Sequence, residues 1–522
     1  MHLSLLDIFI ILLYPILILG VGYFIAPERG AFDADSIHPT TRKRTLPWWA
    51  IGTSLIAANI SAEQIIGMSG SAYAFGLAIA AYEWLAALML LIVGKYFLPV
   101  FLKHNIRTMP EFLRRRYGPR LQLTMALLWL ALYIFVNLTA ILWLGATAVH
   151  AVTGLTLIVS LILLGLFAGN YALYAGLKTT SATDAVQVAM LVLGGLIILY
   201  IALTRISGLT GAEGVITGLV RLREKLPDHF HMILSHDNPY YKYAPGLGMI
   251  GAGMWVVNLS YWGFNQYIIQ RALTARSLRQ AQKGVILAAA LKMLIPVLVV
   301  LPGIAAVLLV GPGQRPDAAY PMLMAQMPSG ILGFVFVALL AAIISAMGSS
   351  LSSIATIFSR DVLTALQPAS GERLQIIAGR FAAITALLIA MVSAVPLLGH
   401  VDQAFQYIQE FTGFLTPAVT VIFLLGMGWK YASERGALCA VAGSLIGSLG
   451  FWYFLPQVPF ILRIGYVFAI SLLVMVVVSR LTPHPKPTDM RFDTVDYSTD
   501  TSYTVAFLVI VGILGAIYLL WW

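Results

Sequence analysis

Polar side chains in the middle of apolar stretches are the residues of this sequence that could carry chemistry. The centre of the apolar segment at residues 47–72 holds four of them, followed by two glycines: Asn59, Ser61, Glu63, Gln64, Gly67 and Gly70. Within a lipid bilayer each such side chain costs at least about 2.5 kcal/mol unless it has a partner or a cavity. The pattern predicts an interrupted helix whose freed carbonyls bind a cation or a polar solute. The alternative is a kink that neighbouring helices stabilise.

A second apolar segment, residues 245–271, has the same character. Its polar residues lie among aromatic side chains: Asn258, Ser260, Asn265 and Gln266. It is the seventh apolar segment and residues 47–72 are the second, a spacing expected of two five-helix repeats with inverted topology. The two halves show no residue-level similarity. We therefore expect a solute site near the bilayer midplane, between the two interrupted segments.

Three further polar residues lie inside apolar segments. Lys292 is about 12 Å from the start of its helix at 1.5 Å per residue, so a cavity-facing ammonium is favoured over one that reaches the interface. Glu83 and Gln409 lie near helix starts, where an interfacial position is the alternative. Together these amides and charges donate to and accept from hydroxyls, which fits a polyol better than a carboxylate or an apolar solute.

Two residues suggest an ion. Asp184 begins an apolar segment and is either an ion relay or a helix N-cap after Thr183. Ser345 lies on a face of small and hydroxyl residues in the segment at residues 329–358. That face is typical of close helix packing, but a hydroxyl there could also complete a sodium site, since hard cations prefer oxygen ligands.

Other candidate sites are weaker. The histidines at positions 229, 231 and 236 share one hydrophilic loop and are expected to be solvated rather than metal-binding. No nucleophile and base stand at catalytic spacing, so the sequence does not predict an enzyme. Cys439 is the single cysteine, which excludes a disulfide framework. We expect no cofactor, and the net charge of +10 is attributed to membrane topology rather than to nucleic-acid binding.

The elements that must position these residues are transmembrane helices. The 522 residues are 60% hydrophobic and 10% charged, too little polar surface for a soluble globule. Windows of about 20 residues predict an all-α polytopic membrane protein. Its expected helices number fourteen, at residues 5–25, 47–72, 76–102, 121–150, 154–174, 184–206, 245–271, 284–311, 329–358, 376–397, 404–427, 436–455, 460–480 and 503–522.

The basic residues predict the orientation. Most of the 32 Lys and Arg residues fall in alternate loops, as expected for cytoplasmic loops. This arrangement predicts a multi-pass protein of the cell membrane, the inner membrane in a bacterium, with both termini extracellular or periplasmic. The longest hydrophilic loop spans about residues 207–244 and is too short for a soluble domain. No feature of the sequence specifies an oligomeric state.

Four stretches of the sequence are distinctive: LPWWAIGTSLIAANISAEQIIGMSGSAYAFGLAIAAYEW, YWGFNQYIIQR, VVLPGIAA and AFQYIQE. They resemble the sodium/solute symporter family, whose members include bacterial sodium/galactose transporters and sodium/glucose cotransporters. The likeness runs to about residue 430. It implies a LeuT-like fold with inverted repeats at residues 47–206 and 245–427. It also implies an extra helix within residues 1–46, an extracellular loop at 207–244 and three peripheral helices within 428–522.

The resemblance also implies roles for individual residues. Sugar-binding positions of the family match Asn59, Gln64, Glu83, Asn258, Tyr261, Lys292 and Gln409, where Tyr261 stacks on the sugar ring as a gate. The surrounding gate layer matches Met68, Tyr82, Tyr133, Trp262 and Phe405. One position departs from the pattern, because Ala86 replaces a sugar-contacting serine. The loss of that hydroxyl bears on sugar preference by about 1 kcal/mol.

A sodium site follows from the same resemblance. Its backbone ligands match Ala57, Ile60 and Ala342, its hydroxyl ligand matches Ser345, and Asp184 matches an acidic residue on the inward exit path of the ion. Ala346 replaces a second hydroxyl ligand. The resemblance implies sodium-coupled import of a galactose- or glucose-like hexose by alternating access, with sugar, sodium and the lipid bilayer as partners. Sodium-independent or proton-coupled sugar transport is the alternative raised by Ala346.

Overall fold

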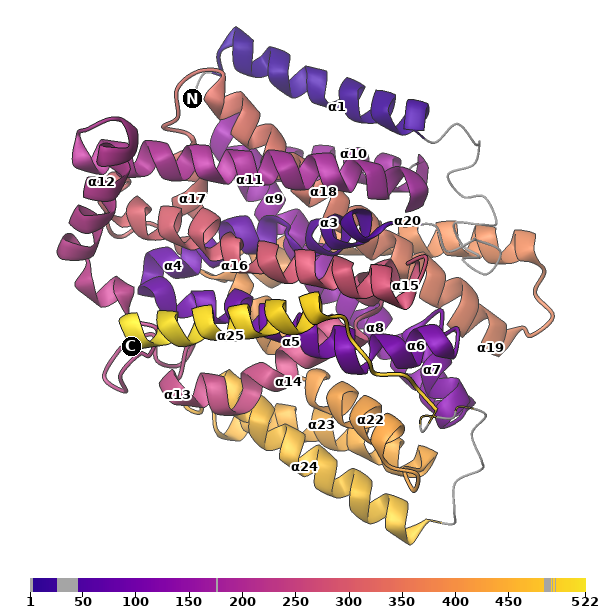
Figure 1. The fold of residues 1–522 in the computed structure, drawn as a ribbon. Coiled ribbons are helices and arrows are strands. Elements are labelled where there is room, and N and C mark those ends of the chain that lie inside the picture. Colours follow the sequence, from indigo (N-terminus) through magenta and orange to yellow (C-terminus); the bar gives the residue numbers. More distant parts are fainter. Residues whose placement is uncertain (1–2, 26–45, 175–176, 483–489, 491, 493) are drawn as a thin grey trace.

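The computed structural model describes residues 3–25, 46–174, 177–482, 490, 492 and 494–522. Within these residues the structure is helical, and the β pairing is limited to an isolated bridge between Leu46 and Ala275. Long helices lie side by side across the molecule (Figure 1). The predicted all-α class is therefore confirmed.

The first half of the chain contains α1 (Leu5–Ile25), α3 (Trp48–Asn59), η1 (Glu63–Met68), α4 (Ser69–Phe75), η2 (Gly76–Ala80), α5 (Ala81–Tyr96), α6 (Leu98–Lys103), α7 (Met109–Arg116), α8 (Pro119–Leu132), η3 (Tyr133–Leu138), α9 (Thr139–Thr153), α10 (Leu157–Tyr174), α11 (Leu177–Ser207), α12 (Gly211–Lys225) and η4 (Pro227–Phe230). The second half contains α13 (Gly246–Gly248), η5 (Met249–Gly253), α14 (Met254–Leu259), η6 (Ser260–Phe264), α15 (Gln266–Leu273), α16 (Leu278–Leu309), α17 (Pro316–Met324), α18 (Ile331–Ile357), η7 (Phe358–Leu363), α19 (Thr364–Leu366), α20 (Glu372–Leu398), α21 (Ala404–Thr412), α22 (Thr416–Gly428), α23 (Glu434–Phe454), α24 (Phe460–Leu481) and α25 (Thr501–Leu520).

Many of these helices are suited to a bilayer. Within the described residues, nine are long and apolar enough to cross a membrane, and ten if α21 and α22 form one span bent by 44°. The expected spans at 47–72 and 245–271 are divided by interruptions, and those at 5–25 and 154–174 are represented by shorter apolar helices. The number fourteen thus stays a prediction, while the polytopic membrane architecture is confirmed.

The interruption predicted in the second segment is present. Helix α3 ends at Asn59 because Ile60 adopts an extended backbone, with φ −77° and ψ 112°. The backbone N–H of Ser61 then donates to Oε1 of Gln64 at 3.1 Å instead of continuing the helix. Carbonyls at the end of α3 thereby lose their helical donors, and the chain resumes as η1, a π-helical turn.

A second interruption lies in the seventh segment. There η6 ends at Phe264, and Asn265 adopts an extended backbone, with φ −82° and ψ 122°. The side chain of Asn265 caps α15 by accepting from the backbone N–H of Tyr267. An asparagine at this position therefore ends one helical piece and starts the next.

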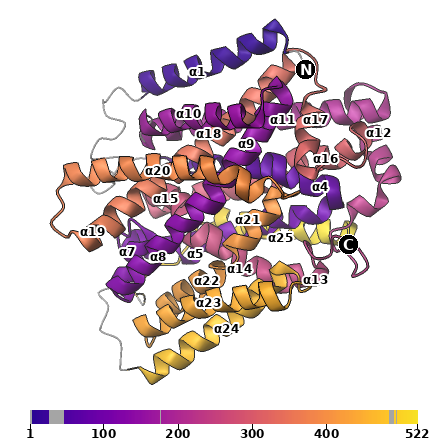
Figure 2. The same ribbon diagram turned by 180° about the vertical axis from the view of Figure 1, so that it is seen from behind.

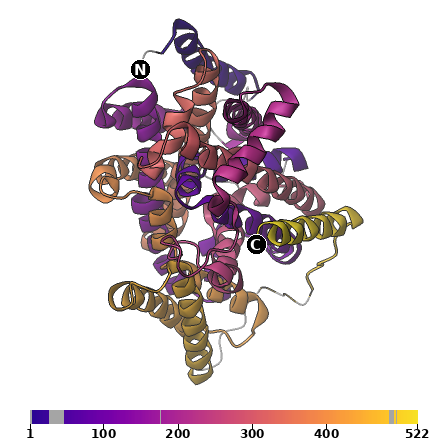
Figure 3. The same ribbon diagram turned by 90° about the vertical axis from the view of Figure 1, so that its left-hand side faces the viewer.

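Helix α16 lies at the centre of the molecule and packs on α3, α4, α5 and α11. Helix α18 packs on α1, α10, α11 and α20 on the neighbouring side. The last three helices lie at the edge of the bundle, with α23 and α24 packed as a pair and α25 separate from them (Figure 3). Only 17–28% of the most apolar window of each of these helices is buried, as expected of helices whose side chains face lipid.

Both chain ends lie on one side of the molecule, together with α12 (Figures 1 and 2). The opposite side carries α7 and α19. The loop expected at 207–244 is partly helical, because it contains α12 and η4. Gly76 lies below this loop with φ +78°, and a Cβ there would meet the backbone oxygen of His229 at 2.2 Å, so the contact requires glycine.

Candidate solute and ion sites

Glu83 and Lys292, two of the charged residues singled out from the sequence, form an ion pair with each other. Glu83 lies in the first turn of α5 and Lys292 in the middle of α16, and the two side chains are 5% and 1% exposed. The ammonium also lies 5.0 Å from the ring centre of Trp262. A buried charge is tolerated when it is paired, so neither residue needs to reach the membrane surface.

A hydrogen-bonded row connects the two interrupted segments. Nδ2 of Asn59 donates to the Tyr261 hydroxyl at 2.9 Å, which in turn lies 2.6 Å from the Tyr267 hydroxyl. The Tyr261 ring meets the edge of Trp262, with ring centres 5.3 Å apart. The row therefore joins the Glu83–Lys292 pair to the end of α3. The amide oxygen of Asn59, Oδ1, is buried and has no hydrogen-bond partner among the described residues.

Two other predicted solute contacts bond to nearby residues of their own interrupted segments. Oε1 of Gln64 accepts from the backbone and the hydroxyl of Ser61, at 3.1 and 3.3 Å. Nδ2 of Asn258 donates to the backbone oxygen of Met254 at 3.2 Å. Both side chains are buried. Their amides stabilise the interrupted segments, and a solute would compete for these bonds.

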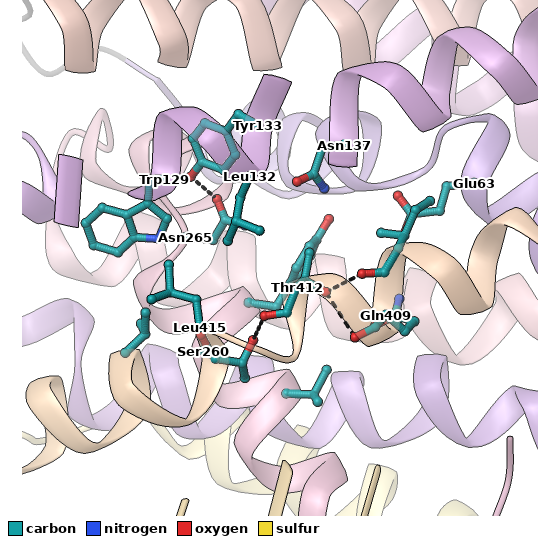
Figure 4. A pocket seen from close by; sticks show the side chains of 15 residues that line it. Glu63, Trp129, Leu132, Tyr133, Asn137, Ser260, Asn265, Gln409, Thr412 and Leu415 are labelled. Atoms are coloured by element: carbon teal, nitrogen blue, oxygen red, sulfur yellow. Dashed lines mark hydrogen bonds between the residues drawn. The ribbon is translucent and has the colours of Figure 1, made fainter. Parts of the chain in front are cut away.

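A pocket opens between η1, η3, η6 and the bent pair α21–α22 (Figure 4). The residues that line it are Glu63, Trp129, Leu132, Tyr133, Asn137, Val257, Ser260, Tyr261, Asn265, Ile408, Gln409, Thr412, Leu415, Thr416 and Val419. Glu63 and Gln409 lie together at one end of it, and Trp129 and Tyr133 lie at the other (Figure 4). Of the predicted solute contacts, Tyr261 and Gln409 line this pocket. The Glu83–Lys292 pair is not among its lining residues.

Some lining residues were missed by sequence reasoning. Asn137 is the clearest, because it is 4% exposed in the centre of an expected membrane helix and the cost of burying an amide would have identified it. Thr412 and Thr416 gave no such signal, since a threonine can bond to its own helix. Both do so here, to the backbone oxygens of Ile408 and Thr412 at 2.6 and 2.8 Å.

The residues expected to form a gate layer fall into separate groups. Tyr82 meets Phe405 edge-on at 5.2 Å between ring centres, and its buried hydroxyl has no partner among the described residues. Tyr133 lines the pocket and donates to Oδ1 of Asn265 at 2.6 Å, which fixes the second interruption. Trp262 lies under Lys292. Met68 is fully buried in η1.

Two of the predicted ion-site residues, Ser345 and Asp184, contact each other. Ser345 donates to Oδ1 of Asp184 at 2.8 Å, and the Ser54 hydroxyl donates to Oδ2. The guanidinium of Arg271 lies 3.4 Å from the same oxygen and also donates to Ser349 at 2.7 Å. Asp184 is thus held by α3, α15 and α18 together. These contacts do not favour a role for Asp184 as a helix cap.

The other predicted ion ligands are at the end of α3 and on α18. Helix α18 packs directly on α3 and carries Ala342, Ser345 and Ala346, all of them buried. The backbone oxygens of Ala57 and Ile60 lie at the interruption, where helical donors are missing. Carbonyls and one hydroxyl suit a hard cation such as sodium. Ser54 and Arg271 were not predicted as partners, because each contacts Asp184 across a large sequence separation.

A helical membrane protein with two interrupted helices, buried polar residues between them and an oxygen-rich site beside them is a secondary transporter of the LeuT-like class. Solved structures agree on the fold. A Na⁺-coupled sialic acid symporter in a substrate-bound outward-open state is similar with a TM-score of 0.80 and 21% identity, over 92% of this chain and 99% of that one. A nucleobase-cation-symport-1 family transporter in a closed conformation is similar with a TM-score of 0.53 and 16% identity, over 84% and 94%.

The chain belongs to the sodium:solute symporter family, which it matches over residues 41–482. It is 42% identical to a sodium/glucose cotransporter of Vibrio parahaemolyticus, over 100% of this chain and 99% of the relative. Two proteins of Oryctolagus cuniculus are also similar over 84% of this chain. Sodium/myo-inositol cotransporter 2 is 31% identical over 69% of its own length, and sodium/glucose cotransporter 1 is 30% identical over 71%. The protein is therefore a sodium-coupled solute symporter of the membrane and not an enzyme.

Proposed function

We propose that this symporter imports a galactose- or glucose-like hexose together with sodium. The observation that carries the proposal is the buried Glu83–Lys292 pair beside Trp262. A carboxylate accepts two hydroxyl hydrogens and an ammonium donates to hydroxyl oxygens, so the pair suits vicinal hydroxyls. The aromatic residues Tyr261 and Trp262 offer apolar surface next to it, as an amphipathic sugar ring needs. The names of the similar proteins in Vibrio and rabbit support the same substrate class.

The proposed contacts are divided between two places. Asn59, Glu83 and Lys292 bind hydroxyls at the interrupted helices, with Tyr261 against the ring. Gln409 binds from the neighbouring pocket, and Gln64 and Asn258 exchange their helix bonds for bonds to the solute. Asn59 provides a buried acceptor atom that has no partner among the described residues. Binding of a hydroxyl there would remove the cost of an unsatisfied polar atom.

Sodium, the coupling ion, is proposed to bind between α3 and α18 at Ala57, Ile60, Ala342 and Ser345. An ion at this place replaces the donors that the interruption removes from α3. Asp184 accepts a hydrogen bond from the Ser345 hydroxyl and contacts Arg271, and we propose that it lies on the exit path of the ion. We further propose that the outer loop 207–244 and both chain ends face the cell exterior, and that residues 47–206 and 245–427 form the two inverted repeats.

Uptake into proteoliposomes tests the proposed function. Labelled galactose, glucose and myo-inositol are compared under an inward sodium gradient, an inward potassium gradient and no gradient. Sodium-driven accumulation of a hexose is the expected result. Preferred accumulation of myo-inositol would contradict the hexose, and accumulation of none of the three would contradict a polyol substrate.

Neutral variants then examine the site. Glu83→Gln and Lys292→Met each leave a buried charge without its partner, which costs about 3–5 kcal/mol and should abolish uptake. The double variant removes both charges and should recover protein yield but not hexose uptake. Recovery of uptake in the double variant would show that the pair is structural and would contradict its role in binding.

A further inference from the structure

Three elements meet on the side of the molecule that carries both termini. They are α4, α17 and the start of α21. Oδ2 of Asp317 in α17 accepts the backbone N–H of Ala404 in α21 at 2.8 Å. The Ser71 hydroxyl of α4 donates to Oε1 of Gln403 at 3.2 Å and accepts from Nε2 of Gln406 at 3.3 Å. These bonds join the start of α21 to both neighbouring helices.

Backbone contacts bring the same elements together. A Cβ on Gly70 would lie 2.5 Å from the backbone oxygen of Pro316, so α4 and α17 touch with no side chain between them. The residue after Ala404 is Phe405, which rests on η1, where a Cβ on Gly67 would lie 2.9 Å from the Phe405 Cβ. The Phe405 ring also meets Tyr82. The position of the first turn of α21 therefore determines whether Phe405 covers η1, the piece that follows the first interruption.

The carboxyl group of Asp317 is unusual for a residue outside the membrane-spanning helices. It is 4% exposed, and its second oxygen, Oδ1, is buried with no hydrogen-bond partner among the described residues. The nearby Arg315 instead donates to the backbone oxygen of Val401 at 2.9 Å and lies 4.0 Å from the exposed Asp402. Within the described part of the chain, Asp317 is thus a buried acid without a salt bridge.

Burial raises the pKa of Asp317 to about 7, and the Ala404 N–H and the charge of Arg315 oppose the rise, whereas Asp402 adds to it. The other elements packed on α17 are α4, α9, η1, α16 and α18. Titratable residues on these elements are Tyr73, Glu63, His150, Arg279, Lys283 and Lys292. Tyr73 donates to Gly311, His150 bonds to Leu155, and Lys292 pairs with Glu83. The charges that act on Asp317 are those of Arg315 and Asp402.

We propose that Asp317 is a positioning residue that holds α21 on α17 and α4, closing this side of the transporter, and that loss of its proton releases the contact. The charge of an ionised carboxyl is costly in a buried joint and cheap in water. A proton therefore favours the closed arrangement. This side can then open more readily as the pH of the adjoining solution rises.

The size of the effect follows from linkage. In the open arrangement Asp317 meets water and has the ordinary pKa of an aspartate, about 3.9. The closed arrangement binds the proton more tightly, so its advantage is complete below the open-state pKa and is lost as pH rises through about 7. Between pH 6 and pH 8 the ratio of closed to open molecules should fall about tenfold.

Hydrogen exchange on the full chain in lipid nanodiscs, without sodium or solute, tests this proposal. The amides of α21 at residues 404–412 are followed at pH 6 and pH 8, after correction for the pH dependence of intrinsic exchange. Their protection should fall about tenfold between the two pH values. Asp317→Asn keeps an acceptor for Ala404 and stays neutral, so its protection should be high at both. Asp317→Ala removes the acceptor and should be weakly protected at both.

Asp402→Asn is the matched control, because it removes a neighbouring acidic charge that is 80% exposed and makes no bond to α21. It should keep a pH dependence like that of the wild type, with the midpoint somewhat lower because Asp402 adds to the rise in the pKa of Asp317. A wild-type chain with pH-independent protection at residues 404–412 would overturn the proposal, and so would an Asp317→Asn chain with the wild-type dependence. The wild-type and Asp402→Asn measurements decide the question even if an Asp317 variant fails to fold.

Discussion

Ser345 and Ala346 are neighbours on α18, and only Ser345 can offer a side-chain oxygen to a cation. The remaining proposed ligands are backbone oxygens at the end of α3 and on α18, which do not depend on side-chain type. A sodium ion held by them has one protein oxygen fewer than the family pattern implies. Water can take the missing position at little enthalpic cost. Sodium coupling is therefore compatible with Ala346, with a lower affinity for the ion.

Ala346→Ser should lower the sodium concentration for half-maximal uptake by about tenfold, because one more oxygen contacts the charge. The measurement is initial solute uptake in proteoliposomes as a function of external sodium. Ala341→Ser is the matched control, since it adds the same hydroxyl at another buried position of α18. An equal response in both variants would mean that position 346 does not face the ion.

The sequence identified the polar residues of the site but not their partners. The cost of burying Glu83 and Lys292 marks both as functional or paired, yet nothing in either segment says that they pair with each other. Partners 209 positions apart depend on how α5 and α16 pack. The same holds for Asp184, whose contacts with Ser54 and Arg271 come from two other helices.

Helix interruptions determine where the site lies, and small residues let the pieces approach each other. At Gly67 in η1 an added Cβ would lie 2.9 Å from the Cβ and 3.4 Å from the backbone nitrogen of Phe405. Neither atom is the flexible end of a side chain. The first turn of α21 can therefore reach its observed position only because residue 67 has no side chain.

Gly67→Ala should cost about 1–3 kcal/mol in the closed arrangement and push Phe405 away from η1. Transport turnover should fall by about tenfold or more, since closure is needed in each cycle, while the chain still folds. Gly251→Ala is the control, because a Cβ there has nothing within 4 Å. Both are compared as uptake rate per folded molecule, and a normal rate for Gly67→Ala would contradict the argument.

At the level of elements, the sequence predicts the apolar segments and their polar interruptions, but it does not predict the lengths of the helices. The breaks at Ile60 and Asn265 lie within the stretches that sequence reasoning marked, because polar residues and glycine disturb a helix locally. Helix α16 begins at Leu278, six residues before the expected start, since its first turns are polar and project beyond the apolar run. Helix α17 was not expected at all, as nine residues with two prolines give little helical signal.

The molecule as a whole has two ends of different character. One carries both chain termini and α12, and the other carries α7 with Arg114, Arg115 and Arg116 (Figure 1). The membrane class could be predicted from composition because lipid exposure requires an apolar surface. Arg116 shows the limit of counting charges, because it is 5% exposed and donates to the backbone oxygens of Gly426, Trp429 and Ala432. This arginine stabilises the end of α22, a role that is separate from any effect of its charge on the orientation of the protein in the membrane.

Positive loops are retained in the cytoplasm, so the end with α7 should face inward and the end with α12 outward. Two exposed positions report on this orientation: Glu213 in α12 and Gln367 after α19. Each is changed to cysteine in a Cys439→Ser background, which removes the single native thiol. A membrane-impermeant thiol reagent added to intact cells should modify the Glu213→Cys protein and spare the Gln367→Cys protein. Inverted vesicles should give the opposite pattern, and modification of Gln367→Cys in intact cells would reverse the proposed orientation of both termini.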